Sequence, residues 1–168
     1  MHGSLLYYAH IQEKLGNVEG ARKTLSQVRE LMEMQANRED SYCIELHNNL
    51  ACAYMIHGQL EITHGGDKAT AREYLKRARE ELEGVEAAEP NVGVYNLACV
   101  CGLEADVLET DEERTRAMQE CHRWLQALVD HHVPLQHRPP AHEIRMDECL
   151  ESVRSCEWFE PLLSILNP

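Results

Sequence analysis

Side chains that bind zinc gather in one stretch of the sequence. Six histidines and cysteines fall within it: Cys121, His122, His131, His132, His137 and His142. Zinc takes four nitrogen or sulfur ligands, so this set is chemically sufficient. Its spacings match no zinc finger, however, and the prolines between residues 133 and 140 indicate a polar connecting segment. We expect no metal site, and we keep a metal or thiol sensor in the Cys121–His142 region as an alternative.

Other patterns that carry catalysis are missing from the sequence. Cys99 and Cys101 are two residues apart, and such positions point away from each other on a helix, which disfavours a disulfide. We find no phosphate-binding loop, nucleophile elbow or His-Glu-x-x-His motif. Neighbouring acids such as Glu112 and Glu113 are ordinary solvated charges unless a pocket shifts their pKa values. We therefore expect a protein that is not an enzyme and needs no cofactor.

Two asparagines open near-copies of one hexapeptide. Asn49-Leu50-Ala51-Cys52-Ala53-Tyr54 returns as Asn96-Leu97-Ala98-Cys99-Val100-Cys101, which is 96 − 49 = 47 residues later. An apolar-small-apolar segment that recurs at such a spacing is typical of stacked helical repeats. An asparagine amide both donates and accepts hydrogen bonds, so Asn49 and Asn96 suit an extended peptide ligand. Each could equally bond a neighbouring helix, and both interpretations stay open.

The composition excludes several classes of partner. The chain has 168 residues, 43% of them hydrophobic, and a net charge of −13. Nucleic acids and anionic membranes attract Lys and Arg, so neither is an expected partner, and a basic or neutral protein is favoured. No stretch approaches the roughly 18 consecutive apolar residues of a membrane span. Seven cysteines, an odd number, without a signal-peptide pattern predict reduced thiols in a cytoplasmic protein.

Apolar residues recur at helical spacing along the chain. The alternating runs of β-branched residues that would indicate strands are not found. We predict an all-α fold with repeats at residues 4–37, 41–87 and 91–132, a linker at 133–140 and a C-terminal helical cap at 141–168. Thr110 followed by Glu113 is typical of a helix start. In the cap, we expect Trp158 and Phe159 to cover the apolar face that a last repeat would otherwise expose.

Residues 4–130 resemble the tetratricopeptide repeat family, whose unit of about 34 residues is a helical hairpin. The matching positions are Ala9, Leu15, Gly16, Ala21 and Leu25 in the first repeat, Leu50, Ala51, Tyr54, Gly66, Ala71, Leu75 and Ala78 in the second, and Leu97, Ala98, Ala117 and Cys121 in the third. The second repeat departs by an insertion at residues 57–64; if helical, it would lengthen the first helix and project past its neighbours. The resemblance implies a right-handed α-solenoid of three hairpins. The first repeat starts at the chain end without an N-terminal cap, which is typical of the C-terminal part of a longer array.

The resemblance also implies a function. In this family, the first helices of the repeats line a concave groove that binds extended peptides or helices. The residues at these positions here are His10, Glu45, Asn48, Asn49, Cys52, Tyr95, Asn96 and Cys99. No Lys or Arg stands at the carboxylate-clamp positions, which disfavours an acidic C-terminal tail as the ligand. We expect a non-catalytic protein–protein interaction module (a scaffold, adaptor or regulatory domain), with a self-associating homodimer as an alternative.

Overall fold

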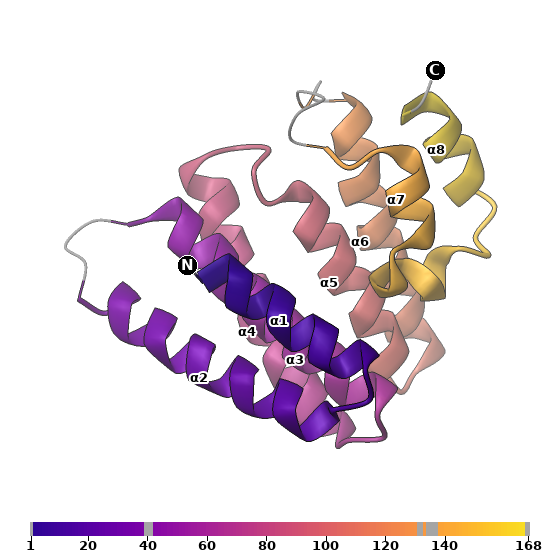
Figure 1. Ribbon diagram of the computed structural model, residues 1–168. Helices are drawn as coiled ribbons and strands as arrows, with labels where there is room; N and C mark the ends of the chain where they lie inside the picture. Colours follow the sequence, from indigo (N-terminus) through magenta and orange to yellow (C-terminus); the bar gives the residue numbers. More distant parts are fainter. Residues whose placement is uncertain (1, 39–41, 131–132, 134–137, 167–168) are drawn as a thin grey trace. The chain divides into compact units, whose positions relative to one another are not determined.

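The computed structural model describes residues 2–38, 42–130, 133 and 138–166, and the regular secondary structure in these ranges is helical throughout (Figure 1). The helices are α1 (His2–Lys14), α2 (Val18–Ala36), α3 (Ile44–Thr63), α4 (Lys68–Ala88), α5 (Val94–Val107), α6 (Asp111–Asp130), α7 (Ala141–Met146), the 3-10 helix η2 (Glu148–Val153) and α8 (Phe159–Leu166). The predicted all-α class is confirmed. Among these helices, none combines the length and the apolar character that crossing a bilayer requires. The chain divides into two compact parts, unit 1 (residues 1–88) and unit 2 (residues 89–168).

Unit 1 contains two helical hairpins, α1 with α2 and α3 with α4, and α2 also packs against α3. The buried stripes of α2 and α4 recur every three or four residues, which puts each stripe on one helix face. They comprise Ala21, Leu25, Val28 and Met32 in α2, and Ala71, Leu75, Ala78, Leu82 and Val85 in α4. Gly16 and Gly65 follow the first helix of each hairpin with φ values of 80° and 68°, a left-handed conformation that glycine adopts without strain.

The insertion at residues 57–64 extends a helix. It forms the last part of α3, and His57, Gly58 and Leu60 are buried there. A Cβ atom at Gly58 would press on Leu75, so the glycine allows α3 and α4 to approach closely. Because α4 has 21 residues and α3 has 20, the two helices are extended together. The expectation that this insertion projects past its neighbours is therefore wrong.

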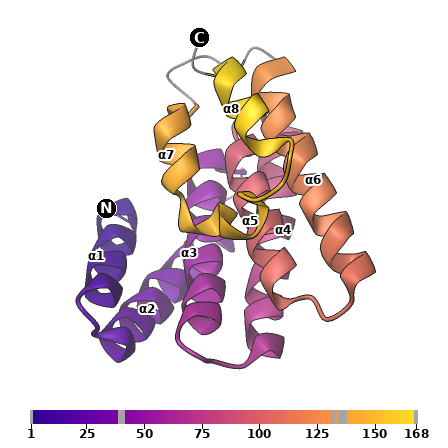
Figure 2. The same ribbon diagram turned by 90° about the vertical axis from the view of Figure 1, so that its right-hand side faces the viewer.

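In unit 2, α5 is the most deeply buried helix, because α6 packs along one side and η2 along another (Figure 2). The core that α5 shares with the following helices includes Phe159, which has no exposed surface, and half-buried Trp158 packs against this core. At the start of α6, the Glu113 backbone N–H donates to Thr110 Oγ1 at 3.2 Å, and the Thr110 N–H donates to a Glu113 carboxylate oxygen at 3.4 Å. The helix start predicted there is confirmed.

The C-terminal segment does not form one helix between residues 141 and 153. It breaks at Asp147, whose backbone is extended between α7 and η2. The Asp147 carboxylate accepts the Cys149 backbone N–H at 2.9 Å and the Tyr95 hydroxyl at 2.6 Å. A contact with α5, distant in sequence, thus holds the break. Residues 134–137 of the predicted linker, residues 131–132 at the end of the third predicted repeat and residues 39–41 around the start of the second lie outside the described ranges.

Candidate functional site

A pocket with a volume of about 540 Å³ lies in unit 1, where α2, α3 and α4 meet. Most of its lining side chains are charged or aromatic. They are Arg29, Glu33, Ala36 and Asn37 from α2 and its C-terminal end, His47, Leu50 and Tyr54 from α3, and Glu73, Tyr74, Arg77 and Glu81 from α4. On α3, the spacing 47, 50 and 54 places the three side chains on one face, since a helix turns about 100° per residue.

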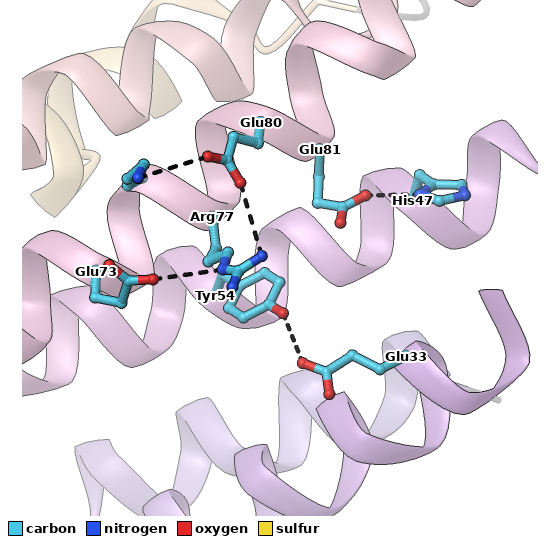
Figure 3. A network of polar contacts seen from close by, with 8 residues as sticks. Glu33, His47, Tyr54, Glu73, Arg77, Glu80 and Glu81 are labelled. Atoms are coloured by element: carbon cyan, nitrogen blue, oxygen red, sulfur yellow. Dashed lines mark hydrogen bonds and ion pairs between the residues drawn. The ribbon is translucent and has the colours of Figure 1, made fainter. Parts of the chain in front are cut away.

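Tyr54 connects two walls of the pocket. Its hydroxyl donates to Glu33 Oε1 on α2 at 2.6 Å (Figure 3). Burial, and then the Glu33 carboxylate, raise the pKa of Tyr54 well above its usual value, so the phenol remains a donor. The Glu33 carboxylate is thereby held in one orientation at the pocket wall.

Arg29 lies beside the same tyrosine. The carbon of its guanidinium is 5.8 Å from the centre of the Tyr54 ring and 5.6 Å from that of Tyr74. Its Nε is 3.3 Å from a Glu33 oxygen. A planar cation that lies over two neighbouring aromatic rings and beside one carboxylate is restrained in both position and orientation, so Arg29 contributes a fixed positive charge.

The opposite wall carries acidic side chains of α4. His47 Nδ1 lies 2.6 Å from Glu81 Oε2 (Figure 3). The His47 ring also stacks on Tyr42 at 4.0 Å between ring centres. Arg77 lies 3.5 Å from Glu73 and 3.9 Å from Glu80. The pocket therefore holds three carboxylates against two guanidinium groups, and the charges of these five side chains sum to 2 − 3 = −1.

His57 lies behind the pocket, in the insertion. It is 2% exposed, and its ring stacks on Tyr74 at 4.6 Å between ring centres. Burial, and then the positive charge of Arg29, lower the pKa of His57 to about 4, so its imidazole is neutral near pH 7. The sequence singled out the insertion but did not indicate that its first residue supports the pocket floor.

This arrangement presents groups that can recognise a ligand. The described pocket lining includes no Ser, Thr or Cys, so it offers none of the usual hydroxyl or thiol nucleophiles. It offers carboxylates for cationic groups, a phenol and an amide for hydrogen bonds, and aromatic faces for apolar contact. The positively charged side chain of a Lys or Arg is complementary to the net negative charge of this lining.

Sequence reasoning missed the pocket. The groove residues predicted in unit 1 are Glu45, Asn48, Asn49 and Cys52 on α3, together with His10 on α1. At about 100° per residue, the four on α3 lie on the side opposite Leu50 and Tyr54. They are partly or fully exposed, and their role as a ligand surface stays a prediction. The missed signal was the i,i+4 charge pairing of Arg29 with Glu33 and of Glu73 with Arg77.

The groove residues predicted in unit 2 differ in their exposure. Tyr95 and Asn96 help to line a shallow pocket of about 360 Å³. Cys99, by contrast, is 1% exposed, because the η2 segment covers that side of α5. A residue so deeply buried cannot contact a groove ligand, so the expectation for Cys99 is corrected.

Cys99 instead meets two residues of the C-terminal segment. The ligand atoms of Cys99, Asp147 and Cys149 all lie within 4.8 Å of one another. Hydrogen bonding with Cys149, burial and the nearby Asp147 charge raise the pKa of the Cys99 thiol. No spacing rule links residue 99 to residues 147 and 149, so only the folded chain reveals this cluster.

The described histidine and cysteine side chains of the Cys121–His142 region do not come together as a ligand cluster. Cys121 is buried, and burial raises the pKa of its thiol. His122 stacks on Trp158 at 4.3 Å between ring centres, and the His142 side chain is 76% exposed. Among the described residues, these three do not form a cluster of ligand atoms; His131, His132 and His137 lie outside the described ranges.

Comparisons with protein-family models, with curated proteins and with solved structures give no match. The functional argument therefore rests on the residues and geometry described above.

Proposed function

We propose that this protein is a non-catalytic protein–protein interaction module of the tetratricopeptide-repeat type, and that unit 1 binds a peptide or helix bearing Lys or Arg. The observation that carries the proposal is the pocket between α2, α3 and α4, in which Glu33, Glu73 and Glu81 outnumber the two arginines. Charge-assisted hydrogen bonds from a ligand cation to such carboxylates are stronger than neutral ones.

The restraint of the pocket walls supports this proposal. Tyr54 holds Glu33, and the tyrosine rings hold Arg29, so binding does not require these side chains to become ordered. Preorganised groups retain more of their interaction energy on binding. The net charge of −13 acts in the same direction, because it attracts basic ligands at long range.

The repeat architecture is part of the proposal. Each predicted repeat corresponds to a hairpin that packs on itself: α1 with α2, α3 with α4, and α5 with α6. Small residues stand at close helix contacts, as at Gly58 and Ala71. A reducing, cytoplasmic location belongs to the same proposal, and it is supported by seven cysteines that no disulfide links.

The test uses peptides selected from a random library on the wild-type chain and then measured individually by fluorescence anisotropy. In the pocket variant, Glu73→Gln with Glu81→Gln, we expect Lys- or Arg-bearing peptides to bind about tenfold or more weakly, because a hydrogen bond to a charged group contributes about 1.5–3 kcal/mol. The control, Glu112→Gln with Glu120→Gln, removes the same charge from positions of α6 that do not line this pocket, and it should bind normally.

A third variant tests the face predicted from the sequence. If Asn49→Ala with Asn96→Ala weakens the peptides while the pocket variant does not, the ligand occupies that face and the pocket assignment is wrong. A large loss of helicity in the asparagine variant would instead show that those amides are structural. A library that yields no peptide discriminated by any of the variants contradicts the binding function itself.

Self-association is a second candidate, favoured by one face of α1. Tyr7, Tyr8 and Ile11 on α1 and Leu15 directly after it recur at helical spacing, and they are 67%, 53%, 37% and 79% exposed. A second copy could cover this apolar stripe. Light scattering over a range of concentrations decides: we expect a dimer that Ile11→Lys dissociates, and a wild-type chain that stays monomeric refutes this candidate.

A further inference from the structure

The cluster of Cys99, Asp147 and Cys149 in unit 2 has no role in peptide recognition. Cys99 comes from the middle of α5, whereas Asp147 and Cys149 come from the break between α7 and η2. The two cysteines are 1% and 7% exposed, and Asp147 is half-buried. Two buried thiols and a partly exposed carboxylate therefore lie close together.

We propose that Cys99, Asp147 and Cys149 bind a Zn²⁺ ion. Tetrahedral zinc has bonds of about 2.3 Å to sulfur and about 2.0–2.2 Å to carboxylate oxygen, which places neighbouring ligand atoms roughly 3.5–3.8 Å apart. Cys99 Sγ is 3.8 Å from Asp147 Oδ2, and the three ligand atoms lie within 4.8 Å of one another. Displacements of about 1 Å therefore bring all three to coordination distance.

The groups around Asp147 resemble the supporting shell of a metal site. Tyr95 donates its hydroxyl to Asp147 Oδ2 at 2.6 Å, and the Cys149 backbone N–H donates to Oδ1 at 2.9 Å. Arg154 donates to the Asp147 backbone carbonyl at 2.8 Å. A carboxylate has about four lone-pair positions, so these bonds orient it and still leave positions for a cation.

The approach of η2 to α5 depends on a glycine one turn beyond Cys99. A Cβ atom at Gly102 would collide with the carbonyl oxygen of Cys149. Ser152 Oγ donates to the Gly102 carbonyl at 2.8 Å and ties the same two elements together. The backbone is therefore arranged so that Cys149 reaches Cys99.

The ligand types select the metal. Thiolates favour Zn²⁺ and Cu⁺ over Mg²⁺ and Ca²⁺, and a carboxylate oxygen favours Zn²⁺ over the softer Cu⁺. Three protein ligands leave the fourth zinc position to a water molecule. This site differs from the Cys121–His142 alternative considered from the sequence, because it uses none of those residues.

The test titrates the full-length, reduced protein with Co²⁺, which replaces zinc and gives an absorption band when thiolates coordinate it. We expect one Co²⁺ per chain with a thiolate band that Zn²⁺ removes by competition. Cys149→Ser and Cys99→Ser should abolish the band, whereas the control Cys121→Ser, another buried thiol of unit 2, should retain it. Tyr95→Phe should keep the band and weaken binding by about 10- to 100-fold.

Folding is monitored separately, because replacing a buried cysteine can prevent folding. Far-UV circular dichroism identifies such a variant, and Tyr95→Phe then carries the test. Zn²⁺ should also raise the melting temperature of the wild type and not that of Cys149→Ser. Co²⁺ binding without a thiolate band, or a band that is unchanged in Cys149→Ser, overturns the proposal and points to histidines outside the cluster or to a cluster that is only structural.

Discussion

The buried imidazole of His57 makes the stability of this protein depend on pH in a defined direction. The ring is 2% exposed and stacked on Tyr74, and it has a hydrogen bond to the Leu25 backbone. Protonation would place a positive charge near Arg29 and Arg22, and burial, the larger effect, also opposes it. The pKa of His57 is therefore lowered from 6.5 to about 4 in the folded chain.

The direction in which stability changes with pH depends on which state, folded or unfolded, binds the proton. Above about pH 6.5 the histidine is neutral in both states, so it adds no pH dependence. As the pH falls from 6.5 to about 4, the unfolded chain binds a proton at His57 and the folded chain does not. Stability is therefore lost across this window. At 1.36 kcal/mol per pH unit, the loss reaches about 3 kcal/mol near pH 4.

The perturbation is His57→Gln, which removes the titrating group but keeps a polar side chain. Urea unfolding followed by far-UV circular dichroism gives the free energy of unfolding at a series of pH values. Between about pH 7 and about pH 4, the wild type should lose about 3 kcal/mol more than His57→Gln. The comparison is between the two losses, because the variant also loses the Tyr74 contact at every pH.

A matched control and a direct titration complete this test. His142→Gln removes an imidazole that is largely exposed and should keep the wild-type pH dependence. The NMR titration of His57 in the folded protein should have its midpoint near 4. Equal losses of stability in the wild type and His57→Gln, or an NMR midpoint near 6.5, would refute the reasoning.

Three further predictions concern unit 2, and each is measured by urea unfolding. Gly102→Ala should destabilise the protein by about 1–3 kcal/mol, because the new Cβ meets the Cys149 carbonyl; Gly3→Ala, in open space on α1, is the control and should be neutral or stabilising. Thr110→Ala removes the capping box of α6 and should cost about 1 kcal/mol, and an unchanged stability would show that this cap is dispensable. Phe159→Ala should cost about 3–5 kcal/mol, whereas Ile165→Ala, 58% exposed on α8, should cost far less; equal costs would place Phe159 outside the core.

Much of the local structure followed from the sequence because its causes are local. Helical periodicity predicted the apolar stripes of α2 and α4, and the residues Thr110 and Glu113 predicted the start of α6. These signals depend on residues three or four apart, which share a helix face whatever the rest of the chain does. The all-α class followed from the same periodicity.

The sites could not be obtained in this way. The peptide pocket brings Glu33, Tyr54 and Glu81 together from three helices, and the choice of helix face that meets a neighbour is made by packing. The sequence placed the groove on the other side of α3, and it placed Cys99 on a surface that η2 covers. Likewise, the insertion was visible in the sequence, but only the contacts of Gly58 with α4 showed that it is part of the hairpin core.

The sequence by itself therefore determined the helical class, the apolar faces and the acidic charge of this protein, since these depend on composition and short-range spacing. The tertiary structure alone decided which polar groups meet: Arg29 over two tyrosine rings, His57 buried and neutral, and Cys99 beside Asp147 and Cys149. The physical reason is that a side chain's electrostatic and ligand properties depend on neighbours within a few ångströms, and in a folded chain these neighbours come from residues distant in sequence.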